Sequence, residues 1–553
     1  MSDETSDSEN DIEYPSTFPA ALKNNTPVSQ QTMRDALELR KQEEKALLPL
    51  IDEFHTIDPQ IRALRKRKRW LRKEAALHKG AIRACSTILS PFRRLPPDIL
   101  HEIALQCLPK YQFGIRRQAP VSLSQVCSAW RTAVLSMSRL WSELYVEIQD
   151  ADHPIYPLSI RIREFFKRAG QRPLTFKLFS QWNQMALKSS EFILRFLDLI
   201  HPTIISVTRL YLGGSSIFHL LSLFRKYSFK NLELLVLVER SDGSTSDSLM
   251  RRSSHVFPQS HLRQLFLDLP DADHNSSFFQ MFCWSNLTKL TMLDYLYVEE
   301  WTQVLDVCPM LQVGFFRIIV TDNIGGQERP PPHVHSTLHD LVLDLHGEGI
   351  FPAYHTLSIP EILQIFQFPA LQRIEVIHKV TYEATRTTIL EPIVPLTTLS
   401  LIDDHYNCFQ WFIPLVFAGV NVRQFEFRGT NYLNNIHLVE LLISQDPIVL
   451  PSLSSLVLHL PLPGRRDDDV SNKSIFADKF MEMVHARCSR EPTAPFRSLL
   501  ELDVSIIEAE EVHTTLLERS RPYADRVHIR FEDKKIRSQH HEEEFMEQWH
   551  RDL

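Results

Sequence analysis

LELLVL at residues 232–237 and LRQLFL at residues 262–267 are two copies of one short phrase, L-x-x-L-x-L, which returns throughout the chain beyond residue 150. The twelve copies are centred on residues 210, 235, 265, 290, 313, 341, 374, 399, 425, 456, 502 and 527. Successive centres lie 23 to 33 residues apart, with a single interval of 46. Apolar residues that alternate over so short a stretch predict a strand with one buried face.

The segments between the phrases have a different pattern. Helices are expected at residues 217–229, 299–307, 361–366 and 437–444, and polar loops at 242–254, 325–335 and 464–469. A proline precedes several of the strands: Pro258, Pro309, Pro369, Pro451 and Pro495. Because proline disfavours helical geometry in the residue before it, these prolines end a helix before the strand begins. Residues 147–535 are therefore predicted to form an α/β domain of strand-and-helix units.

This region resembles a divergent leucine-rich-repeat solenoid, a family in which a strand and a helix recur every 20–29 residues. The resemblance implies that each unit packs against its neighbours and that the strands line a concave binding side. The asparagine that the family carries late in each repeat is mostly missing here. The alternative is an ordinary α/β domain whose parallel strands share the phrase.

The resemblance also places the residues between the inward-facing leucines on the concave side. The candidates for binding a target are Arg209, Tyr211, Phe266, Asp268, Asp344, Arg373, Glu375, Glu426 and Arg428, joined by Asp340, His459, Glu501 and Asp503. Charges of both signs with an occasional aromatic ring suit protein recognition better than binding of a uniformly negative phosphate backbone. For any one of these residues, the alternative is a solvated strand surface.

Three short helices are predicted upstream of the repeats, in a region that includes LPPDILHEI at residues 95–103, LSQVCSAWR at 123–131 and LW at 140–141. Proline fixes φ at the start of the first helix, and Asp98 suits its positive N-terminus. Apolar residues then follow at helical spacing. Helices totalling about 50 residues bury little core on their own, so a partner that covers their spare apolar surface would stabilise them.

These stretches together resemble the F-box. Its anchors are present in order: Leu95, Pro96, Asp98, Ile99, Leu100, Ile103, Leu123, Val126, Cys127, Trp130, Arg131, Leu140 and Trp141. The resemblance implies binding to the Skp adaptor of an SCF-type cullin-RING ubiquitin ligase. The residues that it places at that adaptor are Leu95, Pro96, Ile99, Leu100, Ile103, Leu123, Val126 and Trp130. Basic residues outnumber acidic ones here, which suits an acidic adaptor, although the basic loop 110–118 is longer than in compact F-boxes.

The N-terminal region divides into a tail and a helical segment. Residues 1–31 are acidic and rich in Ser and Thr, so a disordered tail is expected. Residues 32–90 have apolar residues at helical spacing with breaks expected near Pro49 and Pro59, which predicts a helical hairpin or short coiled coil. Packing within the chain is expected here, with a dimer as the alternative. The run RKRKR at 65–69 is interpreted as a solvated helix face, with a nuclear import signal or nucleic-acid patch as the alternative.

Composition excludes several classes of protein. The 553 residues are 43% hydrophobic and 23% charged, as in folded proteins, and the net charge of -7 argues against a basic nucleic-acid binder. Seven widely spaced cysteines without C-x-x-C predict a reducing compartment. Neither a secretory signal nor an apolar run of ~18 residues is found. Phosphate loops and nucleophile motifs are absent, so no enzyme activity, cofactor or metal is expected.

The predicted organisation is a tail (1–31), a helical hairpin or coiled coil (32–90), an F-box (91–146), a leucine-rich-repeat-like α/β solenoid (147–535) and a C-terminal tail (536–553). The function expected from the resemblances is substrate recruitment. The F-box would bind the Skp adaptor and cullin complex, and the repeats would bind an unidentified protein, in the cytoplasm, the nucleus or both. The alternative is an adaptor-bound scaffold or chromatin-associated protein that ubiquitinates nothing. Neither a membrane nor a nucleic acid is expected as a partner.

Overall fold

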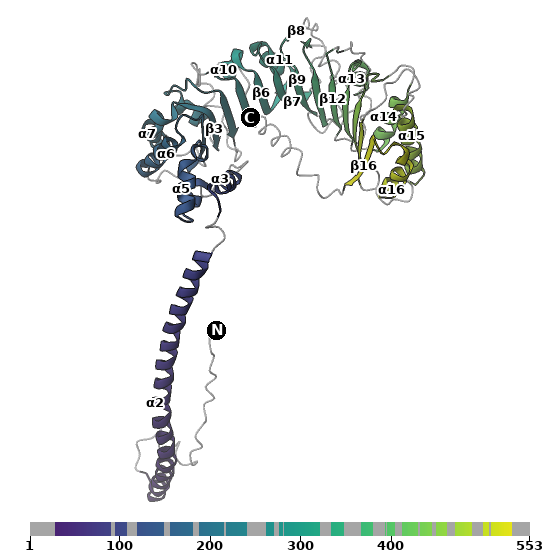
Figure 1. Ribbon diagram of the computed structural model, residues 1–553. Coiled ribbons are helices and arrows are strands. Elements are labelled where there is room, and N and C mark those ends of the chain that lie inside the picture. Colours follow the sequence, from purple (N-terminus) through teal and green to yellow (C-terminus); the bar gives the residue numbers. More distant parts are fainter. Residues whose placement is uncertain are drawn as a thin grey trace. The chain divides into compact units, whose positions relative to one another are not determined.

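A parallel sheet of fourteen strands lies in the second of two units into which the chain divides, Met1–Pro96 and Pro97–Leu553 (Figure 1). The computed structural model describes residues 28–89, 95–107, 119–148, 155–180, 187–214, 217–239, 261–269, 276–279, 281–320, 333–347, 366–379, 393, 395–403, 412–429, 432–444, 449–461, 470–488, 501–507 and 510–532. The described chain is therefore an α/β protein with a helical N-terminal region, as its sequence predicts.

The strands of the large sheet follow one another in chain order, and the sheet does not close on itself. They are β1 (Glu143–Ile148), β2 (Leu174–Ser180), β3 (Val207–Gly214), β4 (Leu234–Glu239), β5 (Gln264–Asp268), β6 (Lys289–Tyr297), β7 (Val313–Val320), β9 (Asp340–Gly347), β11 (Arg373–Lys379), β12 (Thr398–Asp403), β13 (Gln424–Gly429), β14 (Ser455–Pro461), β15 (Glu501–Ile507) and β16 (Val527–Glu532). Two short strands, β8 (His333–Val334) and β10 (Phe366–Gln367), pair separately.

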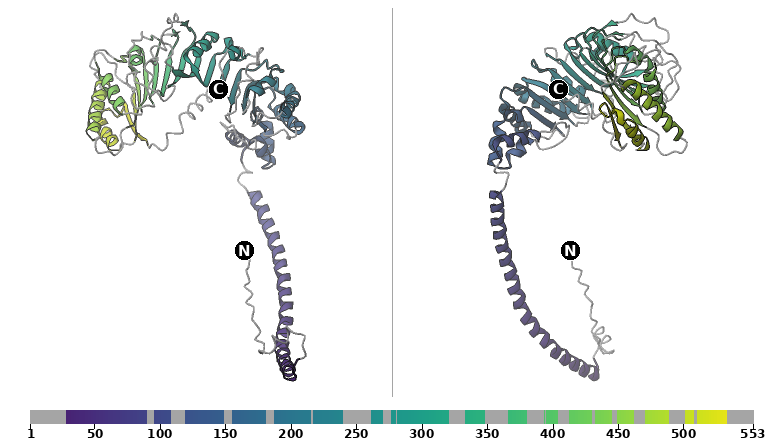
Figure 2. Two further views of the ribbon diagram at one scale, coloured as in Figure 1. Left: turned by 180° about the vertical axis from the view of Figure 1, so that it is seen from behind. Right: turned by 45° about the vertical axis from the view of Figure 1, so that its right-hand side comes forward.

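Helices connect many of the strands and lie along one face of the sheet (Figure 2). They are α6 (Ile155–Ala169), α7 (Leu187–Ile204), α8 (Ile217–Phe224), α10 (Ser276–Phe279), α11 (Val298–Val307), α13 (Ile413–Ala418), α14 (Tyr432–Ile443), α15 (Val470–Cys488) and α16 (Glu510–Arg519), with 3₁₀ turns at η3 (Trp284–Asn286) and η7 (Arg521–Tyr523). Of the predicted helices, α8, α11 and α14 are confirmed.

The leucines of the repeated phrase form the core between the sheet and these helices. In β3, Leu210 and Leu212 are fully buried, and α8 packs against β3 and β4. The same row continues through the neighbouring strands, where Leu235, Leu265 and Leu290 are equally buried. Each such leucine contributes about 1.5–3 kcal/mol through burial, so the row stabilises the packing of each strand against its neighbours and the helices.

One predicted strand has the wrong register. The phrase at 310–315 placed Val313 and Phe315 towards the helices, but Leu290 pairs with Gly314, which turns Gly314, Phe316 and Ile318 inward. A Cβ on Gly314 would lie 2.6 Å from the Phe316 ring, so only glycine fits beneath that ring. Because side chains alternate, the shift of one residue moves every side chain of β7 to the other face.

The N-terminal unit contains one continuous helix, α2 (Gln30–Leu89), and not the predicted hairpin. Pro49 and Pro59 lie inside it, and the helix bends in its N-terminal half (Figure 2). A proline removes one backbone hydrogen bond and favours bending, but it need not reverse the chain. Long runs of Ala, Leu, Glu, Lys and Arg on both sides favour helix and carry it past each proline.

Three short helices open the second unit and pack against one another: α3 (Pro97–Gln106), α4 (Ala119–Ser124) and α5 (Ser128–Ser136). Trp141, in the 3₁₀ turn η2 (Ser138–Trp141), connects them to the sheet. Its Nε1 donates a hydrogen bond to the Val134 carbonyl of α5 at 2.9 Å, and its ring lies 5.0 Å from the ring of Phe165 in α6. The helices α3–α5 and the start of the sheet therefore share one packed core.

Several predicted segments lie outside the described residues. These are most of the acidic tail, the basic loop 110–118, the loops 242–254 and 464–469, most of the loop 325–335, nearly all of the helix at 361–366 and the C-terminal tail 536–553. The end of the 325–335 segment is described as β8, followed by a buried His335.

Candidate protein-binding surfaces

Two parts of the second unit present side chains that could recognise another protein. The first is the group of helices α3–α5. Four large apolar side chains of this group are exposed: Ile99 by 47%, Val121 by 41%, Val126 by 60% and Leu135 by 43%. We call these four residues the helical surface. Exposed apolar side chains that form a contiguous patch mark an interaction site, so these four residues are candidates for one.

The residues expected at the adaptor differ in how accessible they are. Pro96, Ile99 and Val126 are exposed, and Leu95, Ile103 and Leu123 are half-buried. Leu100 and Trp130 are buried, at 3% and 5% exposure, as are the neighbouring Ala104, Ala133 and Val134. Leu100 and Trp130 therefore hold the three helices together from within, and only the exposed members of the set are accessible to a partner.

The second candidate surface is the face of the large sheet opposite its helices, which we call the second face. Because strand residues alternate, Tyr211 points away from α8 where Leu210 and Leu212 point towards it. Strand pairing continues this row from Tyr211 through Phe266, Phe315, Glu375 and Glu426 to Asp503. One row of the second face thus crosses the described sheet from β3 to β15.

The first half of the second face contains an apolar cluster. Tyr211, Leu234, Val236 and Phe266 form a buried cluster on β3, β4 and β5, with Val238 and Leu293 packed against it. The ammonium of Lys177 lies 4.8 Å from the centre of the Tyr211 ring, a cation–π contact at the margin of the cluster. Burial, followed by the charge of Glu143, raises the pKa of Tyr211 to about 12, so its hydroxyl stays protonated at neutral pH.

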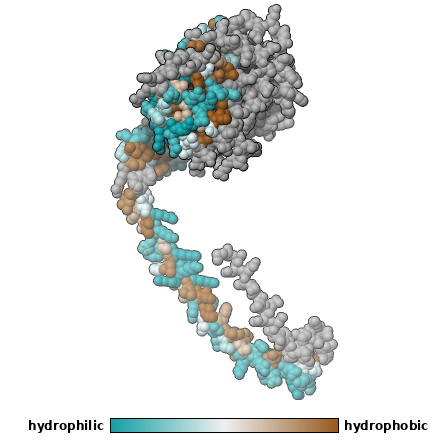
Figure 3. Space-filling view, turned by 90° about the vertical axis from the view of Figure 1, so that its right-hand side faces the viewer, coloured by the Kyte–Doolittle hydropathy of each residue, from teal (hydrophilic) through white to brown (hydrophobic). Residues whose placement is uncertain are grey.

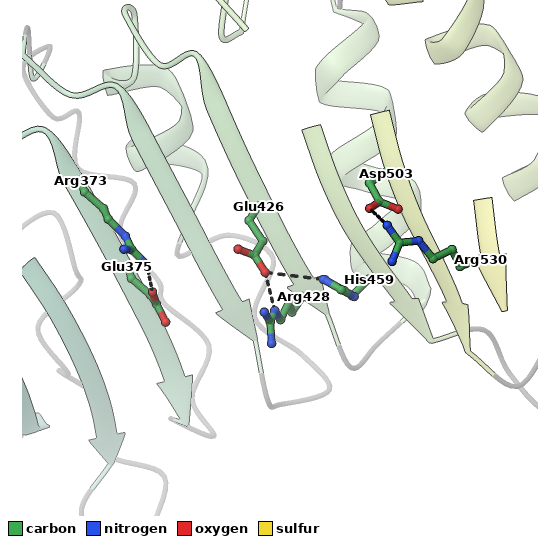
Figure 4. A network of polar contacts seen from close by, with 7 residues as sticks. All are labelled: Arg373, Glu375, Glu426, Arg428, His459, Asp503 and Arg530. Carbon is green, nitrogen blue, oxygen red and sulfur yellow. Dashed lines mark hydrogen bonds and ion pairs between the residues drawn. The ribbon is translucent and has the colours of Figure 1, made fainter. Parts of the chain in front are cut away.

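The second half of the face carries charges of both signs in close pairs (Figure 4). The Arg373 guanidinium lies 3.1 Å from Glu375 on β11, and the Arg428 guanidinium lies 2.6 Å from Glu426 on β13. His459, on β14, approaches Glu426 at 3.6 Å. Further pairs join Arg317 to Asp344 at 3.0 Å and Arg530 to Asp503 at 2.5 Å. We call these residues the charged network.

The structure brings most of the predicted target-binding residues together. Tyr211, Phe266, Glu375 and Glu426 share the row already described, and Asp344 and Arg428 occupy the next row along. Arg209 and Arg373 belong to a third row on the same face. Asp268, two residues after Phe266 on β5, is half-buried. Arg317 and Arg530 also belong to the network, although the repeated phrase did not single them out. So does His346, whose Nε2 lies 3.0 Å from the Asp344 carboxylate.

Two carboxylates of the charged network have pKa values shifted in opposite directions. Burial raises the pKa of Glu375 by more than the opposing charge of Arg373 lowers it. Burial also opposes ionisation of Glu426, but His459 and Arg428 outweigh it and lower the pKa of Glu426 to about 2. The network therefore holds one firmly ionised carboxylate and one that is more easily protonated.

Replacing Glu426 by Gln is expected to lower the free energy of unfolding by about 1–2 kcal/mol at pH 7. The carboxylate ionises near pH 4.5 in the unfolded chain but near pH 2 in the folded one, so it stabilises the fold above pH 4.5. This contribution is lost as the pH falls from about 4.5 towards 2. Urea denaturation at pH 7 and at pH 3 should therefore show a smaller difference between the two proteins at pH 3.

Glu375→Gln is the matched control for this measurement. Because burial raises the pKa of Glu375, removing its charge should cost less at pH 7 than the change at Glu426. A Glu426→Gln protein that is destabilised equally at both pH values would contradict the pKa assigned to that group.

The described residues meet the requirements neither for a metal site of three or more side chains nor for a membrane-spanning helix. Within the residues that the structure describes, no group of three or more His, Cys, Asp and Glu side chains could hold a metal ion. Among the described helices, none combines the length and apolar composition needed to cross a membrane.

The sequence matches no family model, and no curated protein is significantly similar to it. A functional assignment for this chain therefore has to come from its motifs and from the two surfaces described above.

Proposed function

We propose that this protein is the substrate-recruitment subunit of an SCF-type cullin-RING ubiquitin ligase. The single observation that carries the proposal is the exposure of Ile99 on α3 and of Val126 between α4 and α5, within the stretch that contains the ordered F-box anchors. A recruiter needs an apolar surface that its own chain leaves uncovered, since the adaptor has to bury it. The interior residues Leu100 and Trp130 give that surface its shape.

In this proposal, the large parallel sheet is a leucine-rich-repeat-like solenoid that holds the target. Support comes from the chain-ordered strands, each paired only with its neighbours, and from the recurrence of the phrase in them. The charged network would recognise a target of complementary charge. Tyr211 and Phe266 are only 6% and 1% exposed, so the apolar cluster would stabilise the second face and not contact the target. Charge complementarity would chiefly set specificity and association rate.

The proposed subunit is non-catalytic and acts by proximity. Bound to the adaptor, it would raise the effective concentration of a target lysine near a ubiquitin thioester carried by another component of the ligase. Compartments compatible with this role are the cytoplasm and the nucleus.

Protein turnover tests the proposal in living cells of the source organism. Cells carrying Ile99→Asp should accumulate at least one protein with a lengthened half-life, compared with cells carrying Ile160→Asp. Ile160 is an exposed residue of α6 outside the helical surface, so its substitution controls for the charge change. If Ile99→Asp stabilises no protein, the scaffold alternative replaces the ligase subunit.

Reversing a charge of the network should separate target binding from adaptor binding. Arg428→Glu is expected to lower the affinity for the target about tenfold or more, because it places a like charge beside Glu426 and any acidic side chain of the target. Adaptor binding should stay unchanged. Quantitative co-precipitation of both partners measures the two effects, with Arg225→Glu, exposed just beyond α8, as control. Loss of both partners together would indicate misfolding and contradict a separate target surface.

A further inference from the structure

The helix α2 buries none of its side chains. Yet an unbroken heptad frame runs along it from Leu47 to Leu89, with apolar residues at eleven of its thirteen core positions. The a positions are Leu47, Phe54, Ile61, Lys68, Ala75, Ile82 and Leu89, and the d positions are Leu50, Ile57, Leu64, Leu71, His78 and Cys85. Figure 3 shows such apolar side chains exposed between polar ones along the helix. We call this set of residues the α2 stripe.

The spacing of the α2 stripe specifies the shape of its partner. The exposed fraction of its large side chains ranges from 38% for Ile61 to 69% for Leu64. An apolar repeat of 3.5 residues keeps facing a partner only when that partner is another helix wound around it in a left-handed supercoil. A globular partner would need no such regular period over more than forty residues. The stripe is therefore built to pack against a second helix.

Charges divide α2 into two halves of opposite sign. Residues 35–58 contain seven acidic and three basic residues, whereas residues 62–83 contain ten basic residues and one acidic residue. Except for Glu74 at g, the charged residues at the e and g positions, which flank the stripe, follow the same division. Glu44, Glu53 and Asp58 flank the first half, and Arg65, Arg67, Arg72 and Lys79 flank the second. A second helix with the reverse order of charges would complement both halves, and a second α2 running in the opposite direction has that order.

A parallel pair of α2 helices would place like charges together. In register, Glu53 at g would face Asp58 at e of the second copy, and Arg67 would face Arg72. Lys68, at a, would also face its own copy in the core. Only Glu74 with Lys79 would make a favourable flanking pair. Like charges at these positions disfavour the parallel arrangement.

An antiparallel pair centred near residue 59 removes these conflicts. It places the acidic flank of each helix beside the basic flank of the other and, between residues 47 and 71, sets each a residue of the α2 stripe against a d residue. The stripe positions Ala75, His78, Ile82 and Cys85 then face Glu43, Arg40, Ala36 and Met33 of the second copy. Leu47 then faces Leu71, Phe54 faces Leu64, and Ile57 faces Ile61 of the second copy. Lys68 faces Leu50, where its aliphatic stem can pack while its ammonium reaches the acidic flank.

We propose that α2 binds α2 of a second copy of this chain as an antiparallel two-stranded coiled coil. Thirty residues of helix separate residue 59 from Leu89, so the two exits from the coiled coil would lie about 90 Å apart. Such a dimer would present two recruiting units to one target or to one target assembly. Bivalent engagement would then strengthen binding without any new contact on the second face.

The mass of the full chain in solution tests the pairing. Wild-type protein at micromolar concentration should sediment as twice its 64.4 kDa, and Leu64→Asp should weaken the dimer about a hundredfold or more because each dimer would bury two carboxylates. Leu77→Asp is the matched control, since Leu77 has the same 69% exposure on the same helix but lies at a c position. Wild-type protein that stays at 64.4 kDa, or forms a trimer or tetramer, would overturn the proposal.

Charge reversal tests the direction of the helices. Glu53→Lys should weaken an antiparallel dimer, whose basic flank it would meet, and should strengthen a parallel one by pairing with Asp58. Mild oxidation adds a second readout, because only a parallel dimer sets Cys85 against its own copy; disulfide linkage that Cys85→Ser prevents would overturn the antiparallel assignment. A tighter Glu53→Lys dimer would overturn it too. Ile99→Asp should leave dimerisation unchanged, so adaptor binding and dimerisation can fail independently.

Discussion

Changing Ile99 to Asp is expected to reduce binding of the purified Skp adaptor by about a hundredfold or more, which would end co-purification. Ile99 is 47% exposed on α3, so the substitution should leave the packing of the helices intact. In the complex, its carboxylate would be buried against apolar side chains without a partner, which costs several kcal/mol or more. Isothermal titration of the full chain with the adaptor measures the loss.

Ile160→Asp is the control for this experiment, because it makes the same change at a residue of α6 with 37% exposure. Both variants should keep the circular dichroism spectrum and the melting temperature of the wild type. Undiminished adaptor binding by a folded Ile99→Asp protein would remove the helical surface from the proposed interface. Trp130→Ala is a poorer test, since Trp130 is buried and its loss would disturb the helices themselves.

Trp141→Ala should have the largest effect on stability, about 3–5 kcal/mol. The side chain is only 4% exposed, it packs edge-on against Phe165, and the Arg168 guanidinium lies 5.0 Å from its ring centre. Its loss would leave a cavity and the Val134 carbonyl without its indole donor. Hydrogen exchange should show protection falling first in α5, α6 and β1, and denaturant titration should show the loss of free energy.

Two further variants make this prediction specific. Trp141→Phe keeps an aromatic ring but loses the hydrogen bond to Val134, so it should cost less than the alanine variant. Trp70→Ala removes a ring that is 48% exposed on α2 and should leave the stability of the second unit unchanged. A Trp141→Ala protein that unfolds like the wild type would mean that α3–α5 and the sheet are not held together by this side chain.

The sequence was most informative about the strands. Leucines at L-x-x-L-x-L spacing predicted the buried row because each strand repeats the same inward positions, and Leu210, Leu235 and Leu265 all occupy that row. The strand β2 was not predicted, since LTFKLFS places Phe176 and Leu178 at alternate positions without the full phrase. The shifted register of β7 could not be predicted either. Gly314 faces inward, but a glycine has no apolar side chain that would reveal this in the hydrophobic pattern.

Accessibility was the least predictable property of the adaptor-binding set. The sequence shows that Leu100, Val126 and Trp130 are apolar positions in the segment that forms the three helices. It does not show which of these side chains are buried between the helices and which remain exposed. The packing of α3, α4 and α5 decides this, and it buries Leu100 and Trp130 while exposing Val126.

Only part of the charged network could be predicted from single strands. Arg373 with Glu375, and Glu426 with Arg428, are two residues apart in one strand, so their proximity could be anticipated. The pairs of Arg317 with Asp344 and of Arg530 with Asp503 join different strands. Their proximity depends on the alignment of each strand with its neighbour, which the spacing of the phrases only approximates.

The last strand of the described sheet, β16, lies at its edge, where another chain could add a strand. Among the described strands, β16 pairs only with β15, so no described strand pairs with the backbone groups on its other side. Unpaired backbone groups at the edge of a sheet can template a foreign strand. Its sequence, VHIRFE, places His528 and Arg530 between apolar residues. Charges on an edge strand oppose stacking of one sheet end onto another, so these side chains would act as gatekeepers against fibre growth.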